Sequence, residues 1–377
     1  MMKKILSCAL LLSLAGVVLA EDWQTIYENA SNEYNGKRYE DAYDFFKQSV
    51  EEASTPQQKY KSYLHCAYSA YALGKYSESQ RYASRAISVK GISDDQKTRA
   101  YYYKLVARYR LDKKDNAEAM AEIISKNKPF SGSLLGASMY FSSYNWYLKK
   151  DYKKALKLSD VGIELSKPYT TYYYLNTVQQ IRCLRKLNKF NEAFKLAEET
   201  DLKKWPGRYL GELYYEIGYC CFLNEERQEY PDKRDYTRAL KFFKMSVNAH
   251  EDDCRKAKSI YFAGLSHKKM KKYKEAKTSF DLILDMADSP ERYKYRAQFH
   301  IADIYFILKN YKKASTEFSK VPGMECVTVY WKSRALLMEG ESYKELGNKK
   351  ASQNAFSQAA GLEGAPIWVI KEAKKNI

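Results

Sequence analysis

The sequence has few residues that break helices and few that hold metals. Its 377 residues include only 8 prolines, 16 glycines and 4 histidines. It contains no His-Glu-x-x-His arrangement, no Cys-x-x-Cys pair, no glycine-rich phosphate loop and no Gly-x-Ser-x-Gly elbow. The best candidate metal cluster, residues 250–254, sits at a hairpin boundary, where Asp and Glu favour a helix N-terminus. We therefore expect no enzyme, no cofactor and no metal ion.

The composition that remains is typical of a helical protein with a basic surface. The chain is 45% hydrophobic, 29% charged and carries 36 tyrosines, so it can bury a core. Lysine, glutamate, alanine and leucine are good helix formers. The formal net charge of +18 favours an anionic partner, such as nucleic acid, anionic lipid or an acidic polymer. A solvated lysine-rich surface explains the same charge, because most lysines lie in turns and on outer faces.

The first twenty residues are predicted to be a cleaved secretory signal. Lys3 and Lys4 precede an apolar run over 5–19, and short side chains end at Ala20, just before Glu21. The run is short for a membrane span, although an uncleaved anchor is the alternative. We expect cleavage after Ala20, a periplasmic or extracellular location, and no membrane span in the mature chain.

Six cysteines would remain after cleavage, in an oxidising compartment. Cys183 and Cys220 occupy equivalent places in adjacent repeat units, so a disulfide from Cys183 to Cys220 or Cys221 is geometrically conceivable. Buried free thiols are the alternative, since these cysteines lie among apolar helix residues.

A short motif recurs along nearly the whole chain: an aromatic residue, a small residue three places on, and an apolar residue one turn later. In the stretch 271–280 these are Tyr273, Ala276 and Phe280. Successive copies start about 36–40 residues apart, with one longer interval of about 46, which gives about nine units. The copies are Tyr39/Ala42, Tyr76/Ser79, Asn116/Ala119, Tyr152/Ala155, Phe190/Ala193, Tyr236/Ala239, Tyr273/Ala276, Tyr311/Ala314 and Lys349/Ser352.

Each unit is interpreted as two helices joined by a short turn. Prolines fall almost entirely between units, as helix interiors exclude them. The exception, Pro231, lies in Asn224–Arg234, which we interpret as an insertion in the long unit; its role stays open. We expect a signal peptide at 1–20, a helical repeat array at 21–364 and a C-terminal capping helix at 365–377.

These features resemble tetratricopeptide repeats. The resemblance rests on the small residues Ala67, Gly264 and Ala302, on Gly-Lys-Tyr at 74–76 and on proline at unit boundaries, and it covers about 22–361. It implies an all-α, right-handed α-solenoid of helix-turn-helix repeats. Helix-pair repeats of a related type remain an alternative, because the usual interval here exceeds that family's.

In arrays of this family the exposed face of the first helices lines a concave groove that binds partners, so the resemblance places a groove there. The side chains it assigns to the groove are Tyr68, Tyr71, Tyr101, Lys104, Arg108, Tyr140, Tyr144, Tyr147, Arg182, Arg185, Lys186, Tyr215, Tyr219, Lys258, Tyr261 and Lys268. Such an aromatic and basic face suits an acidic protein or peptide. Simple packing of tyrosines is the alternative reading.

We therefore expect a non-catalytic, exported interaction scaffold. The alternative function is a binding protein for an anionic cell-envelope polysaccharide, acting in its export or assembly. An enzyme with an unrecognised site is a weaker reading. Basic and aromatic residues together can also bind single-stranded nucleic acid, but export argues against that partner.

Overall fold

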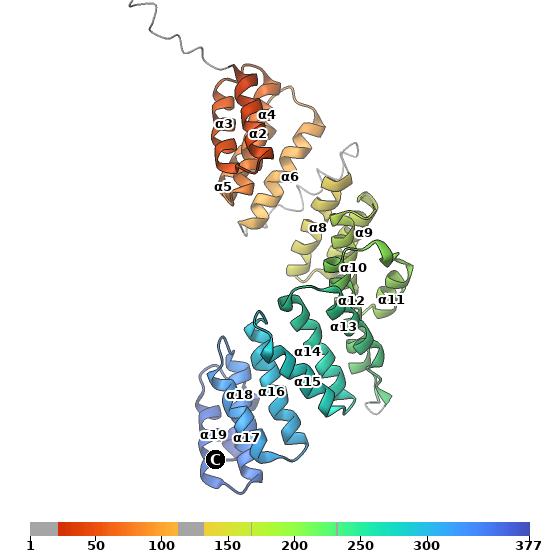
Figure 1. Cartoon of the computed structure of the whole chain (residues 1–377), viewed down its shortest axis with the longest axis vertical. Coiled ribbons are helices and arrows are strands. Elements are labelled where there is room, and N and C mark those ends of the chain that lie inside the picture. Colours follow the sequence, from red (N-terminus) through yellow and green to blue (C-terminus); the bar gives the residue numbers. More distant parts are fainter. Residues whose placement is uncertain (1–21, 112–131, 167, 231–232) are drawn as a thin grey trace, which may run out of the picture. The chain divides into compact units, whose positions relative to one another are not determined.

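The computed structural model describes residues 22–111, 132–166, 168–230 and 233–377. These residues form 18 α-helices and no strand (Figure 1), which confirms the all-α prediction. The chain divides into two compact units, residues 1–176 and 177–377, which are treated separately below. The predicted signal segment and the repeat copy at Asn116/Ala119 lie outside the described residues.

The first unit consists of helices in which chain neighbours pack against each other (Figure 1). In chain order they are α2 (Trp23–Asn35), α3 (Tyr39–Glu51), α4 (Pro56–Ala72), α5 (Tyr76–Ser88), α6 (Asp94–Arg110), α8 (Gly132–Leu148), α9 (Tyr152–Leu165) and the beginning of α10 (Thr171–Lys186).

The second unit holds the rest of α10 with its partner α11, then four complete hairpins and a last short helix. Its helices are α11 (Phe190–Glu199), α12 (Gly207–Glu226), α13 (Thr237–Ala249), α14 (Asp253–Lys269), α15 (Tyr273–Asp285), α16 (Glu291–Ile307), α17 (Tyr311–Lys320), α18 (Val329–Glu345), α19 (Lys349–Gly361) and α20 (Ile367–Lys375). Single 3₁₀ turns lie at Leu202–Lys204 and Val321–Gly323. The first helices α12, α14, α16 and α18 are in contact in that order.

A phenylalanine on the second helix of a hairpin fills the space above a small residue of the first. Phe280 is fully buried, and a Cβ added to Gly264 would lie 2.8 Å from its ring. The same contact joins Gly340 to Phe356, with a Cβ at 2.7 Å. Because no side chain fits between glycine and ring, this pair fixes how closely the two helices approach.

The turn between the two helices of a hairpin has a left-handed residue at a fixed place. Its φ is 60° at Lys271, 59° at Lys309 and 74° at Gly347. The same conformation occurs at Lys37, Gly74, Lys150 and Asn188. A left-handed residue just after the helix ends it and satisfies its last carbonyls. The repeat is therefore a repeat of backbone geometry, although only two of the seven positions carry glycine.

Serine replaces alanine at the close contact in two hairpins and remains satisfied there. Ser79 donates a hydrogen bond of 2.8 Å to the Ala67 carbonyl, and Ser352 donates one of 2.9 Å to the Gly340 carbonyl. A buried hydroxyl would otherwise cost stability. These bonds explain how the motif copies that carry serine in place of alanine still form hairpins.

Specific contacts hold the last helix and the described residues of the insertion. Val369 and Ala373 of α20 are fully buried and pack on a cluster that includes Phe356. In the insertion, Arg234 donates a 2.9 Å hydrogen bond to the Gln228 carbonyl, and the Asp235 amide donates to Glu225 Oε2 at 3.0 Å.

The described cysteines form no disulfide, so the bridge considered from Cys183 to Cys220 or Cys221 is absent from this structure. Cys66, Cys183, Cys220 and Cys221 are buried, whereas Cys254 and Cys326 are exposed. Burial raises the pKa of the Cys66 thiol to about 12 and that of Cys221 to about 11. Such thiols stay protonated and behave as small apolar side chains.

Candidate partner-binding face

The first helices of unit 2 carry a continuous series of charged and aromatic side chains, here named the first-helix face. Residues three and four apart on a helix lie on one side, and each helix contributes three or four of them. The face consists of Arg182, Arg185, Lys186, Glu212, Tyr215, Glu216, Tyr219, Lys258, Tyr261, Lys268, Arg296, Phe299, His300, Asp303, Tyr330, Trp331 and Arg334.

Glu216 of α12 is the centre of a buried ion-pair cluster. Its Oε1 accepts a hydrogen bond of 2.8 Å from Arg182 Nε, and its Oε2 accepts one of 2.9 Å from Arg185 Nε. Burial raises the pKa of Glu216, but the Arg185 and Arg182 guanidiniums outweigh it and, with Lys258, lower it to about 2. The carboxylate is therefore ionised at neutral pH and holds both arginines of α10 in place.

A second carboxylate, Glu212, extends this cluster toward α14. It lies 3.0 Å from Arg182 Nη2 and 3.2 Å from Lys258 Nζ. Lys258 Nζ lies 3.7 Å from the centre of the Tyr215 ring, and the Arg185 guanidinium lies 4.6 Å from that of Tyr219. Ring faces attract cations, so tyrosines and carboxylates together position the basic groups.

Histidine and aspartate organise the next part of the face, between α14 and α16. His300 Nε2 lies 3.1 Å from the Tyr261 hydroxyl, and Lys268 Nζ lies 3.3 Å from His300 Nδ1. Lys268 also pairs with Asp303. Burial lowers the pKa of His300 to about 4, so its ring is neutral at pH 7 and can accept from Lys268.

Arg296 and Arg334 are held by aromatic rings instead of by acids. Trp331 of α18 contacts both of them. Its ring centre is 5.7 Å from the Arg296 guanidinium and 5.1 Å from the Arg334 guanidinium. Arg334 also lies 4.7 Å from the Phe299 ring. Within the described part of the chain, neither guanidinium forms an ion pair with a carboxylate.

The structure distributes the predicted groove residues of unit 2 between the core and the surface. Arg185, Tyr215 and Tyr261 are buried, and Lys186 is exposed. The remaining four, Arg182, Tyr219, Lys258 and Lys268, are half-buried. Sequence reasoning missed the acids that pair with these bases, Glu212, Glu216 and Asp303, and also missed Arg296, Trp331 and Arg334. Helical spacing could have found Glu212 and Glu216, because they lie three residues before Tyr215 and Tyr219 on the same helix.

The predicted groove residues of unit 1 are mostly half-buried tyrosines in contact with one another. Tyr140, Tyr144 and Tyr147 form a row along α8, with ring centres 6.3 and 6.4 Å apart. The other members lie half-buried on α4 and α6: Tyr68, Tyr71, Tyr101, Lys104 and Arg108. Tyr68 packs on Tyr103 at 3.9 Å, and Tyr71 accepts a 3.3 Å hydrogen bond from Arg110. Burial lowers the pKa of Lys104.

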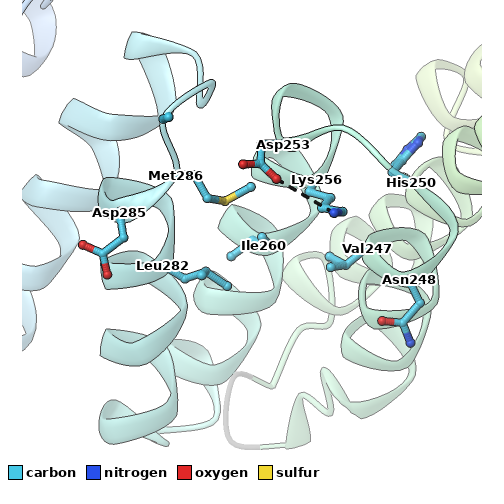
Figure 2. A pocket seen from close by; sticks show the side chains of 10 residues that line it. Val247, Asn248, His250, Asp253, Lys256, Ile260, Leu282, Asp285 and Met286 are labelled. Atoms are coloured by element: carbon cyan, nitrogen blue, oxygen red, sulfur yellow. Dashed lines mark ion pairs between the residues drawn. The ribbon is translucent and has the colours of Figure 1, made fainter.

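A hollow of about 540 Å³ lies between α13, α14 and α15. Figure 2 shows Val247, Ile260 and Met286 around it, with Lys256 paired to Asp253 at its edge. His250 also borders it, and both ring nitrogens are buried without a hydrogen-bond partner.

The sequence around His250 caps a helix, as its pattern favours. Asp252 accepts a 2.8 Å hydrogen bond from the Arg255 amide and so begins α14. No group of His, Cys, Asp and Glu among the described residues could hold a metal ion. Burial also lowers the pKa of His250, which keeps its ring neutral. The hollow is thus a recess of mixed polar and apolar lining beside a helix cap.

The hairpins of α14 to α19 match a known repeat family. Residues 257–290, 295–321 and 333–365 match the family model of the tetratricopeptide repeat. These three hairpins of the chain match the tetratricopeptide repeat. The three matched segments contain most of α14 and α15, of α16 and α17, and of α18 and α19. The family resemblance inferred from the motif is therefore confirmed.

A solved structure extends the likeness to the whole fold. The match to the crystal structure of the apo form of RapI covers 94% of this chain and 97% of the RapI chain, with a TM-score of 0.51 and 13% sequence identity. At this identity the likeness concerns the fold alone. A comparison with curated protein sequences gave no match. Among the helices that the structure describes, none has the length and apolarity that crossing a membrane requires.

Proposed function

We propose that this protein is an exported, non-catalytic scaffold that binds an acidic peptide or protein on its first-helix face. Tetratricopeptide repeats support an interaction scaffold in general. The observation that carries the specific proposal is the preorganised Glu216 cluster, which fixes Arg182 and Arg185 beside the Tyr219 ring. Side chains already held in place lose little entropy on binding, so they suit recognition.

Export is supported by the sequence of the first twenty residues. Lys3 and Lys4, the apolar run and the short side chains before Glu21 have the order of a secretory signal. We place the mature protein in the periplasm or outside the cell. A partner there would be another envelope or secreted protein.

Capture from an envelope extract tests the proposed function. Residues 21–377 would be immobilised, and bound proteins would be quantified by mass spectrometry. A double variant on the first-helix face, Lys186→Glu with Lys258→Gln, should reduce the captured partner by about tenfold or more, since charged groups at an interface set binding and specificity. Both lysines belong to first helices, and Lys258 stacks on Tyr215.

A matched control separates the face from general charge. Lys241→Glu with Lys274→Gln removes the same charge from exposed positions on the second helices α13 and α15. This control should capture the partner within about twofold of the unchanged protein. Equal losses in the two double variants would contradict the proposal.

The alternative partner, an anionic envelope polysaccharide, has one observation in its favour. The row of Tyr140, Tyr144 and Tyr147 on α8 presents successive rings at similar angles. Retention on an acidic glycan resin, without any captured protein, would support this alternative and overturn the scaffold.

A further inference from the structure

Arg296 and Arg334 on the first-helix face differ from four other basic residues there in their lack of a carboxylate partner in the described part of the chain. Arg182, Arg185, Lys258 and Lys268 each pair with a carboxylate of a neighbouring helix. Within the described residues, Arg296 and Arg334 have no such pair. Across the described ranges, this part of the face therefore lacks the direct carboxylate partners that the Glu216 cluster has.

Aromatic rings hold the two guanidiniums while leaving their donors largely unused. Trp331 contacts both guanidiniums, and its ring centre lies 5.0 Å from that of Phe299. Arg334 donates one long bond, 3.3 Å, to the Tyr330 hydroxyl. Arg296 Nε is buried and has no acceptor. A guanidinium has five N–H donors in a rigid fork, so the terminal Nη groups, not the buried Arg296 Nε, are the donors that a ligand would use.

Asp303 and His300 on α16 form no ion pair with Arg296 or Arg334 among the described residues. Asp303 pairs with Lys268, and its Oδ2 lies 4.0 Å from Nδ1 of the neutral His300 ring. His300 contributes no negative charge, and its ring packs against Trp331 at 5.8 Å. A planar anion that accepts two parallel hydrogen bonds is the group that complements a guanidinium held in this way.

We propose that Arg296, Trp331 and Arg334 form a binding site for a carboxylate side chain of an acidic peptide. Apolar surface lies beside it on α18, where Val329 and Tyr330 are 39% and 44% exposed. A peptide supplies a carboxylate and an apolar neighbour together, which favours it over a uniformly polar glycan. The inference rests on the proposed function and names the chemistry of the partner.

The test uses an array of fluorescein-labelled twelve-residue peptides with capped termini. Each contains Ala and one Leu, with two Glu at varied distances from the Leu, and binding to residues 21–377 is measured by fluorescence anisotropy. At least one Glu peptide should bind. Its Gln counterpart should bind at least about tenfold more weakly, because a hydrogen bond to a charged group is stronger than a neutral one. This comparison needs no change in the protein.

Variants then locate the site. Arg296→Gln and Arg334→Gln should each weaken the Glu peptide by about tenfold or more. Arg255→Gln is the matched control, because it removes one exposed positive charge from α14, and it should change binding by less than about twofold. Arg334→Lys keeps the charge but loses the fork, so it should also weaken binding. Circular dichroism would verify that each variant is folded.

Three results would overturn the carboxylate site. They are equal binding of Glu and Gln peptides, equal effects of Arg255→Gln and the two site variants, and absence of binding at millimolar peptide. Tighter binding of a Gln peptide with a free C-terminus would assign the site to terminal carboxylates instead, and tighter binding of oligogalacturonate would assign it to glycans. A captured protein that is unaffected by Arg296→Gln and Arg334→Gln would overturn only this inference and leave the scaffold function standing.

Discussion

Replacing Glu216 by glutamine should lower the free energy of unfolding of unit 2 by about 3–5 kcal/mol, because it leaves the buried Arg185 without its counterion and removes one of the two carboxylates that pair with Arg182. The carboxylate is 3% exposed and pairs with Arg182 and Arg185 at 2.8 and 2.9 Å. Urea unfolding followed by circular dichroism measures the change. Glu192→Gln is the control, since it removes an exposed carboxylate paired with Lys189 and should cost less than about 1 kcal/mol.

The effect of Glu216→Gln should depend on pH. The pKa of Glu216 is lowered from its ordinary 4.5 to about 2 in the folded protein. A carboxyl with a depressed pKa contributes its full stability above the unfolded pKa and loses it as pH falls through the folded one. The difference between the unchanged protein and the variant should therefore narrow progressively below pH 4.5. A difference that stays constant down to pH 3 would show that Glu216 is not an ion-paired anion.

Phe280→Ala should be comparably damaging, with a loss of about 3–5 kcal/mol. The ring is fully buried between α14 and α15 and belongs to a cluster with Ala276, Ile283 and Ile301. Leu282→Ala on the same helix is the control, because that side chain is 49% exposed and should change stability by about 0.5 kcal/mol or less. Thermal and urea unfolding provide the measurement.

A double-mutant cycle would show that the loss comes from the contact with Gly264. A methyl group at Gly264 meets the Phe280 ring at 2.8 Å, so Gly264→Ala alone should destabilise the hairpin. Combined with Phe280→Leu, which vacates the space, it should cost about 0.5–3 kcal/mol less than the sum of the single changes. Additive losses would mean that the close approach of α14 and α15 is not governed by this pair.

The sequence predicts the hairpins well because their determinants are local. Tyr273, Ala276 and Phe280 follow one another on a single helix, and proline marks the ends of units. The left-handed turn residues are less visible, since the positions equivalent to Gly74 and Gly347 are often Lys or Asn. The left-handed conformation costs a non-glycine residue about 1–2 kcal/mol. The packing of the two helices that the turn joins must therefore impose it.

The ion pairs of the face could not be predicted in the same way. Arg182 and Glu216 lie 34 residues apart, and their contact depends on how α10 and α12 are aligned side by side. A helix pattern identifies a shared face within one helix but not the vertical register between two. For that reason the basic residues of the face were expected to be available to a ligand, whereas several of them are bound to acids. Only the structure separates these from Arg296 and Arg334.

The central claim is that partners bind to the first helices and not to the second. Photocrosslinking in living cells tests it most directly, with p-benzoylphenylalanine placed at Lys186 or Lys258 on first helices and at Lys241 or Lys274 on second helices. We predict a crosslinked adduct of the same partner from Lys186 and Lys258 and none from Lys241 and Lys274. Adducts formed only from Lys241 and Lys274 would contradict the account and place the binding surface on the opposite side of the hairpins.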